Sequence, residues 1–237
     1  MSGFTCKIVK NVYHVGVLKK YNAVIYDWDG CLLQSLPTWI DAYKQAFKKT
    51  GLTISTAKIV ELLGNWDAPK LLGHPHPDKA NKEILRHVHD KINSVPFYPN
   101  ALEAISAFKN QGAKIFLVTS TKKQTIKLTK AYTKIEKLID HAIFAEDVKH
   151  HKPHPEAINY IIDKFKLAKV RTAMIGDSDK DIIAAHNAGI DCLWFAPAEN
   201  EIIHDFSYLE SLTPAWRFAD HSEIADMLSY KQTLQDS

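Results

Sequence analysis

Short apolar runs alternate with longer amphipathic segments along most of the chain. Runs rich in β-branched residues predict five strands: Ala23 to Tyr26, Lys114 to Thr119, Ala142 to Ala145, Thr172 to Ile175, and Asp191 to Phe195. Apolar residues at helical spacing predict helices between them: Asn100 to Asn110, Pro155 to Phe165, and Asp181 to Ala188. This alternation is typical of parallel βαβ units. We therefore expect an α/β fold with a doubly wound, Rossmann-like parallel sheet that helices cover on both faces.

The stretch from about Leu36 to Val95 breaks this alternation. It contains no convincing strand, and its pattern predicts three helices: Trp39 to Lys49, Ser55 to Leu63, and Asp78 to Ile92. Pro96 and Pro99 mark the return to the α/β pattern, because proline restricts its own backbone and the residue before it. We expect a helical insertion at residues 36–97 within a core of residues 1–35 and 98–237. Two apolar runs within residues 1–20 predict an edge strand or hairpin.

Composition narrows the class of protein. The chain has 237 residues, of which 46% are hydrophobic and 24% are charged, as in globular proteins with a substantial core. A net charge of +3 with dispersed Lys and Arg predicts no nucleic-acid partner, and no apolar run is long enough to predict a membrane span. Cys6, Cys31 and Cys192 lie far apart without a paired spacing, which favours a reducing, cytoplasmic location.

The first strand ends in the sequence Asp27-Trp28-Asp29-Gly30. Two carboxylates placed together at a strand end repel each other, and each tends to hold a proton unless a cation lies between them. A hard divalent ion, most plausibly Mg²⁺, prefers such oxygen ligands. An ordinary turn is an equally good interpretation of this stretch alone, because Asp and Gly are common turn residues.

Three further polar groups follow predicted strands, at the edge where ligands gather in open α/β sheets. Thr119-Ser120-Thr121 offers hydroxyls for phosphate oxygens or, alternatively, for capping the next helix. Lys152 stands in a proline-rich turn. It is either a charge positioned for function or an ordinary surface lysine. In Gly176-Asp177-Ser178, Asp177 is a candidate to complete the metal site together with Asp181.

These motifs, in this order and with a cap-sized gap after the first, resemble the haloacid dehalogenase superfamily. The resemblance spans about residues 22 to 195, and it is to the branch with a helical cap, which includes phosphoglycolate phosphatase-like and β-phosphoglucomutase-like enzymes. Asp27, Asp29, Thr119, Lys152 and Asp177 stand at the motif positions. Asp29 argues against dehalogenation, because dehalogenases of this superfamily are expected to lack this second aspartate.

The resemblance implies a division of labour among the motif residues. Asp27 is expected to be the nucleophile that forms an aspartyl-phosphate, and Asp29 the general acid and then base. Thr119, Ser120 and Lys152 are expected to bind the phosphate. Mg²⁺ is expected to bind to Asp27, to Asp177 and to the backbone carbonyl of Asp29, with Ser178 and Asp181 supporting these ligands. From the insertion, Asn65, Trp66 and Asp67 are expected to contact the substrate.

The expected function is therefore that of a magnesium-dependent phosphatase acting on a small phosphorylated metabolite. Two alternatives stay open: a phosphomutase that returns the phosphoryl group to a sugar, and a binding protein that kept the fold without turnover. Nothing in the sequence predicts the oligomeric state.

Three weaker signals carry hypotheses of their own. Cys31 stands where the family usually has threonine, which raises the hypothesis of a redox-sensitive thiol beside the nucleophile. Histidines in the segments 74–76 and 150–154 suggest either a transition-metal site or, as we prefer, loop residues, with His151 near the phosphate. The insertion carries nine Lys and Arg against six Asp and Glu, which suits either attraction of an anionic substrate or a solvated helical face.

Overall fold

The computed structural model describes residues 20–225 and residue 228. A six-stranded sheet, parallel throughout, forms its centre in the order β3-β2-β1-β4-β5-β6. The strands are β1 (Ala23–Tyr26), β2 (Lys114–Val118), β3 (His141–Ile143), β4 (Thr172–Gly176), β5 (Asp191–Phe195) and β6 (Trp216–Phe218). The expected α/β fold with a parallel sheet is confirmed, and the five predicted strands are present with bounds that shift by at most two residues.

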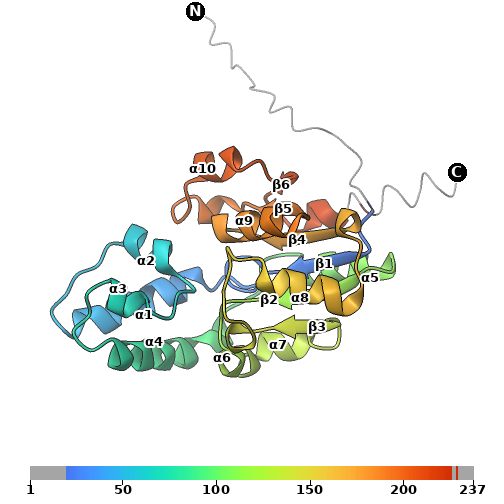
Figure 1. The fold of residues 1–237 in the computed structure, drawn as a ribbon. Helices are drawn as coiled ribbons and strands as arrows, with labels where there is room; N and C mark the ends of the chain where they lie inside the picture. The colour runs from blue at the N-terminus through green and yellow to red at the C-terminus, as the bar shows by residue number, and fades with distance from the viewer. Residues whose placement is uncertain (1–19, 226–227, 229–237) are drawn as a thin grey trace, which may run out of the picture.

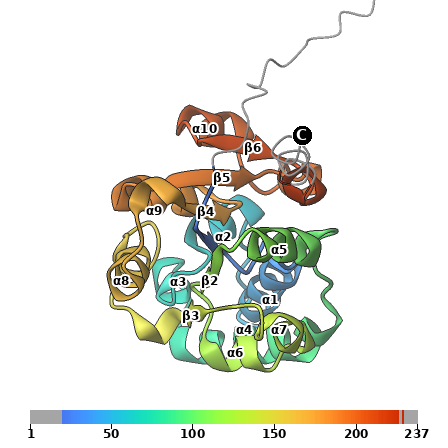
Figure 2. The same cartoon turned by 90° about the vertical axis from the view of Figure 1, so that its right-hand side faces the viewer.

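Helices cover both faces of the sheet, as Figure 2 shows. Residues alternate strictly between the two faces: Val24 and Tyr26 pack into one buried cluster, and Ala23 and Ile25 into the other. The helices outside the insertion are α5 (Ala101–Asn110), α6 (Lys123–Lys127), α7 (Lys130–Ile135), η2 (Ala145–Asp147), α8 (Glu156–Phe165), η3 (Lys169–Arg171), α9 (Asp179–Ala188), η4 (Ala198–Asn200) and α10 (Phe206–Ser211). Helix α5 packs on the first cluster, whereas α8, α9 and α10 pack on the second.

The predicted helical insertion lies beside the end of the sheet where β1 leads into α1 (Figure 1). It consists of α1 (Leu36–Lys48), α2 (Thr56–Leu62), α3 (Ala68–Leu71), α4 (Pro77–Lys91) and η1 (Ile92–Ser94). Helices α1 and α4 pack against each other around a hydrophobic cluster of their own, which includes Phe47, Ile84 and Val88. Residues 36–95 contain no strand, as expected. We keep the name insertion for residues 36–97.

Some elements differ from the prediction. Helix α1 begins three residues earlier than expected, because Pro37 occupies its first turn, where a missing N–H group costs nothing. Strand β6 and the short helices α3, α6, α7 and α10 were not predicted, since segments of three to six residues are too short to show a period. The strand or hairpin expected within residues 1–20 lies outside the described residues, apart from Lys20. Among the described helices, none has the length and apolar character needed to cross a membrane.

A buried histidine packs against the first face of the sheet. His221 is fully buried, with its ring centroid 4.3 Å from that of Phe195 and 5.5 Å from that of Phe218. Its Nε2 lies 3.0 Å from the carbonyl oxygen of Cys31 and therefore donates to it, while Nδ1 has no hydrogen-bond partner among the described residues. Burial lowers the pKa of His221 to about 4, against the opposing effects of this hydrogen bond and of Asp220.

We expect His221 to make stability fall in acid. Its folded pKa lies below its unfolded value, so the neutral form favours folding; this contribution is complete above a pH of about 6.5 and is lost as the pH falls through about 4. The loss should reach roughly 3 kcal/mol. Urea unfolding at several pH values checks it: His221→Phe should show a shallower decline than the wild type. His186→Gln, which changes an exposed histidine of α9, should keep the wild-type decline. An unchanged decline in His221→Phe would contradict the prediction.

Candidate active site

The carboxyl ends of the strands bring the predicted motif residues together. Asp27 follows β1, Thr119 follows β2, and Asp177 follows β4, while Lys152 comes from the loop before α8. Backbone hydrogen bonds continue the sheet into the site: Asp27 N donates to Ile175 O at 2.9 Å, and Thr119 N donates to Ile143 O at 3.1 Å. All four motif residues line one cavity of about 400 Å³ between the sheet edge and the insertion.

Lys152 is the central cation of this cavity. Its side chain is almost fully buried, and its Nζ lies 2.7 Å from Asp27 Oδ1 and 2.7 Å from Asp181 Oδ1. It also donates to the carbonyl oxygen of Val118 at 3.3 Å. Burial alone would lower the pKa of Lys152, but the charges of Asp181 and Asp27 outweigh it and raise the pKa above its ordinary value. The ammonium therefore stays charged beside the proposed nucleophile.

Three buried carboxylates surround this cation. Oxygen atoms of Asp27, Asp177 and Asp181 lie within 4.8 Å of one another. Burial raises the pKa of Asp27 well above its ordinary value, with Lys152 opposing. Burial likewise raises the pKa of Asp177, against the effect of His204, whose Nε2 lies 3.0 Å from Asp177 Oδ2.

This donor set fits a hard divalent cation, because the three buried carboxylates outnumber their basic partners, Lys152 and, when protonated, His204. Asp181 is already engaged on both oxygens: Oδ1 pairs with Lys152, and Oδ2 accepts from the backbone N–H and the hydroxyl of Ser178. Asp181 thereby closes the capping box at the start of α9 and holds Lys152 in place. Asp27 and Asp177 are left as the side chains that would hold the ion.

Asp29 is kept apart from the acidic cluster. Its Oδ1 accepts from Ser35 Oγ at 2.6 Å and from Trp39 Nε1 at 2.8 Å, and its Oδ2 accepts from Thr121 Oγ1 at 2.6 Å. These donors fix the carboxylate at the cavity wall, on the side of the insertion. The two aspartates of the first motif therefore have different surroundings, as two different chemical roles require. The contribution of the Asp29 backbone carbonyl to a metal stays a prediction.

Comparisons with known proteins agree with this geometry. Residues 24–195 match the family model described as haloacid dehalogenase-like hydrolase. The chain belongs to this family. Pyrophosphatase PpaX of Bacillus mycoides is 26% identical over 219 residues, which cover 89% of this chain and 98% of that protein. The structure of a predicted phosphoglycolate phosphatase from Haemophilus somnus covers 90% of this chain and 99% of its own, with 22% identity and a TM-score of 0.69.

The same fold recurs in a hydrolase from Pseudomonas syringae, with 19% identity and a TM-score of 0.73 over 90% of this chain and 98% of that one. The resemblance found in the sequence is thus confirmed at the level of family and fold.

The insertion contributes side chains to the lining of the cavity, while contact of Asn65, Trp66 and Asp67 with a substrate stays a prediction. Asn65 and Trp66 line the cavity, whereas Asp67 is not among the lining residues. The indole Nε1 of Trp66 donates to the backbone oxygen of Ser120 at 3.1 Å. Lys180 of α9 donates to the backbone oxygen of Leu63. These two contacts hold the insertion against the loop that follows β2 and the first turn of α9.

Two further residues support Asp177 from a segment that carries no family motif. Asn200 Nδ2 donates to Asp177 Oδ2 and to the carbonyl oxygen of Gly30, both at 3.2 Å, and Tyr98 OH donates to Asn200 Oδ1 at 2.9 Å. His204 contacts the same carboxylate oxygen, and this contact raises the pKa of the imidazole against the effect of burial. Sequence reasoning missed Asn200 and His204, because both follow the last motif and stand in η4 and in the connection from η4 to α10, where no pattern is recognisable.

The structure bears on two of the three weaker signals at this site, Cys31 and His151. Cys31 is fully buried, its thiol donates to the carbonyl oxygen of Ile175 at 3.5 Å, and burial raises its pKa well above the ordinary value. This thiol lacks the exposure and thiolate character of a redox sensor. His151 is not among the residues that line the cavity, so the expectation that it lies beside the phosphate is wrong.

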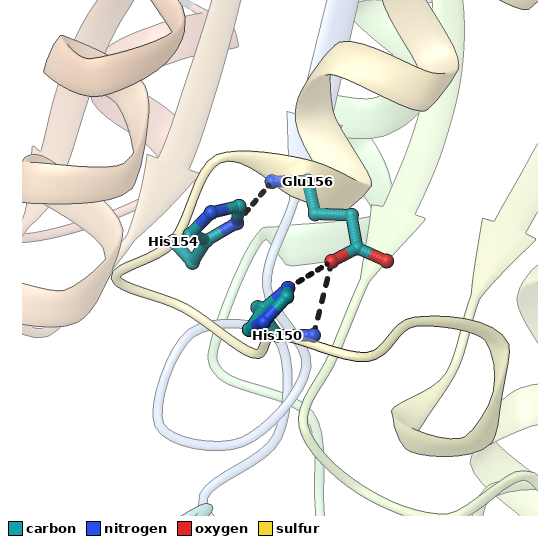
Figure 3. Close-up of side chains that lie close together, drawn as sticks. All are labelled: His150, His154 and Glu156. Carbon is teal, nitrogen blue, oxygen red and sulfur yellow. Dashed lines mark hydrogen bonds and ion pairs between the residues drawn. The ribbon is translucent and has the colours of Figure 1, made fainter.

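His150, His154 and Glu156 form a separate cluster at the start of α8, which Figure 3 shows. His150 Nδ1 lies 2.7 Å from Glu156 Oε2, and Glu156 N donates to His154 Nδ1 at 3.2 Å. The Glu156 carboxylate also accepts from the backbone N–H groups of Lys149 and His150. These contacts join the loop to the first turn of α8. One ligand atom of each of the three side chains lies within 4.8 Å of the others, so a metal site and plain loop residues both stay open as interpretations.

Gly30 provides a sharp test of the active-site packing. Its φ is +80°, and a Cβ atom built on it would lie 2.3 Å from Asp177 Oδ2. Gly112 also has a φ of +80°, but a Cβ there meets nothing within 4 Å. Gly30→Ala and Gly112→Ala should therefore carry similar backbone strain, about 1 to 2 kcal/mol of unfolding free energy. Only Gly30→Ala should displace Asp177.

We expect kcat/KM for a hydrolysed phosphate ester to fall by about 100-fold or more in Gly30→Ala and by less than about threefold in Gly112→Ala. Thermal unfolding and steady-state kinetics on both variants check this. Equal activity in the two variants would show that the space around Asp177 does not matter.

Proposed function

We propose that the protein is a magnesium-dependent phosphatase that hydrolyses a small phosphate monoester through an aspartyl-phosphate on Asp27. The observation that carries this proposal is the buried ion pair between Asp27 and Lys152 beside Asp177, with Asp29 held separately on three hydrogen-bond donors. The names of the relatives, a pyrophosphatase and a phosphoglycolate phosphatase, support phosphoryl chemistry of this kind.

Asp27 attacks phosphorus while the bond to the leaving oxygen breaks, and Asp29 gives its proton to that oxygen. Water then attacks the phosphoryl group of Asp27 and loses a proton to Asp29, which releases phosphate and restores both carboxyls. Mg²⁺ bound by Asp27 and Asp177 would neutralise the repulsion between the anionic nucleophile and the anionic substrate. Lys152, Thr119 and Ser120 bind the phosphoryl oxygens, on which negative charge is spread during transfer.

The hydrogen bonds of Asp29 suit a group that alternates between acid and base. The Trp39 indole can only donate, so Asp29 Oδ1 remains an acceptor and the proton of the acid form belongs on Oδ2. The hydroxyl of Thr121, 2.6 Å from Oδ2, can donate to the carboxylate or turn to accept from the acid. Both protonation states of Asp29 thus keep their hydrogen bonds.

The insertion, as a cap domain of residues 36–97, closes this chemistry off from water. Its contacts through Trp66 and Leu63 join it to the loop that carries Ser120 and to Lys180 in the first turn of α9, so the substrate enters when these contacts open. We also propose a reducing, cytoplasmic location, because Cys31 and Cys192 are buried free thiols.

Substitution of each aspartate should give a distinct kinetic result. With acetyl phosphate and Mg²⁺, Asp27→Asn should lose all turnover. Asp29→Asn should still be phosphorylated, because acetate leaves without a proton, but its phosphoenzyme should hydrolyse about 100-fold to 10,000-fold more slowly. Intact-mass and peptide mass spectrometry should then locate the trapped phosphoryl group on Asp27. Removal of the metal with EDTA should abolish wild-type turnover, and added Mg²⁺ should restore it.

Asp163→Asn, on the exposed surface of α8, is the matched control and should keep wild-type rates. Turnover by Asp27→Asn at the wild-type rate would refute the nucleophile, and turnover that persists in EDTA would refute the metal.

A further inference from the structure

The cavity above the catalytic carboxylates has two chemically different ends. The sheet edge supplies the charged groups described above. The insertion lines its side of the cavity mainly with aromatic and aliphatic side chains, here called the apolar wall: Trp39, Tyr43, Val60, Leu63 and Trp66, with Ile203 from the segment before α10. Trp39 and Trp66 also turn their indole N–H groups toward Asp29 and the Ser120 backbone, and Glu61 and Asn65 line the same side. Because phosphorus must lie at the carboxylates, the apolar wall faces the remainder of the substrate, which is the leaving group.

The basic side chains that line the cavity already form ion pairs or hydrogen bonds with other protein groups. Lys152 pairs with Asp27 and Asp181, His204 contacts Asp177, and Lys180 donates to Leu63 O. No arginine is among the lining residues, although arginine is the side chain best shaped to bind a second phosphate or a carboxylate.

The excess of Lys and Arg over Asp and Glu in the insertion does not make the apolar wall positively charged. All nine of its Lys and Arg residues are exposed, and none of them lines the cavity. The charged residue that the insertion does contribute to the lining is acidic, Glu61, and Asp179 and Asp205 of the core add further carboxylates. The alternative of a solvated helical face therefore accounts for the surplus better than attraction of an anionic substrate into the cavity.

An anionic leaving group would be poorly accommodated here. The second phosphate of pyrophosphate or the carboxylate of phosphoglycolate would lose hydration at the apolar wall, and the basic side chains among the described lining residues already have hydrogen-bond partners. A neutral apolar group would instead exchange water for contact with Trp39, Tyr43 and Val60.

From this asymmetry we propose that the substrate is the phosphate monoester of a neutral alcohol with an aromatic or aliphatic body. This inference rests on the proposed phosphatase function and narrows it to one class of leaving group, which differs from the substrates that the relatives' names print. Specificity then comes from α1, α2 and the loop to α3, which bear these side chains.

Two esters that differ by one remote charge test the proposal. 2-Phenylethyl phosphate has a neutral leaving alcohol, and its para-carboxy analogue has the same reacting centre with an added carboxylate. We expect kcat/KM to be at least about tenfold higher for the neutral ester. Equal or faster hydrolysis of the carboxylate, or no hydrolysis of either ester by a protein that hydrolyses acetyl phosphate, would overturn the proposal.

A substitution at the apolar wall makes the test specific to this end of the cavity. Val60→Lys places a cation there and should reduce the preference for the neutral ester at least about fivefold, mainly through KM for the carboxylate. Val170→Lys is the matched control, because Val170 is 68% exposed in η3 and lies outside the cavity lining. An unchanged preference in Val60→Lys, or the same change in both variants, would overturn the assignment of this wall.

Acetyl phosphate tests the phosphatase function separately from the preference for an apolar leaving group, because its own leaving group, acetate, is too small to fill the space beside the apolar wall. Failure of the wild type to hydrolyse acetyl phosphate and both esters with Mg²⁺ would refute the phosphatase function. Calorimetric binding of the two esters to Asp27→Asn would then decide the inference on its own: tighter binding of the neutral ester supports it, and tighter binding of the carboxylate overturns it.

Discussion

The site depends on a single buried ammonium held between two carboxylates. Lys152 pairs with Asp27 and Asp181 at 2.7 Å each, and removal of this cation would leave a cluster of buried carboxylates without its main compensating charge. The arrangement also explains why several strand ends must meet at one place. Lys152 comes from the loop before α8, Asp27 from the end of β1, and Asp181 from the first turn of α9. The sheet brings these distant segments into contact, and the charges fix them there.

The core of this arrangement was predictable from sequence because its signals are local. Asp27 and Asp177 each end an apolar run, and a parallel sheet gathers such ends at one edge. Continuous apolar runs such as that of β1, each followed by a helical pattern, likewise predicted a parallel sheet covered on both faces. Lys152 was identified by its proline-rich turn.

What was missed depends on contacts that leave no local pattern. Asn200 and His204 contact Asp177, but they follow the last motif, in η4 and in the connection from η4 to α10. Thr121 and Trp39 reach Asp29 from 92 and 10 residues away in the chain, and only the packed insertion shows that they converge. His151 was placed at the phosphate because it precedes Lys152, yet neighbours in a turn can point in different directions. The face of the insertion that carries its lysines and arginines was equally unpredictable, because composition gives only their number.

The central position of β1 in the sheet has a consequence for how the protein is made. Ala23 pairs with Lys114 on one side and with Thr172 on the other, so the first described strand has no neighbour until much of the chain has been synthesised. Non-local pairings of this kind fold slowly, because loop-closure entropy is paid before the contacts form. During synthesis the insertion can pack around α1 and α4 while β1 still waits for its partners. The nascent chain should therefore acquire its helical portion first and its acidic cluster only after β4 has joined the sheet.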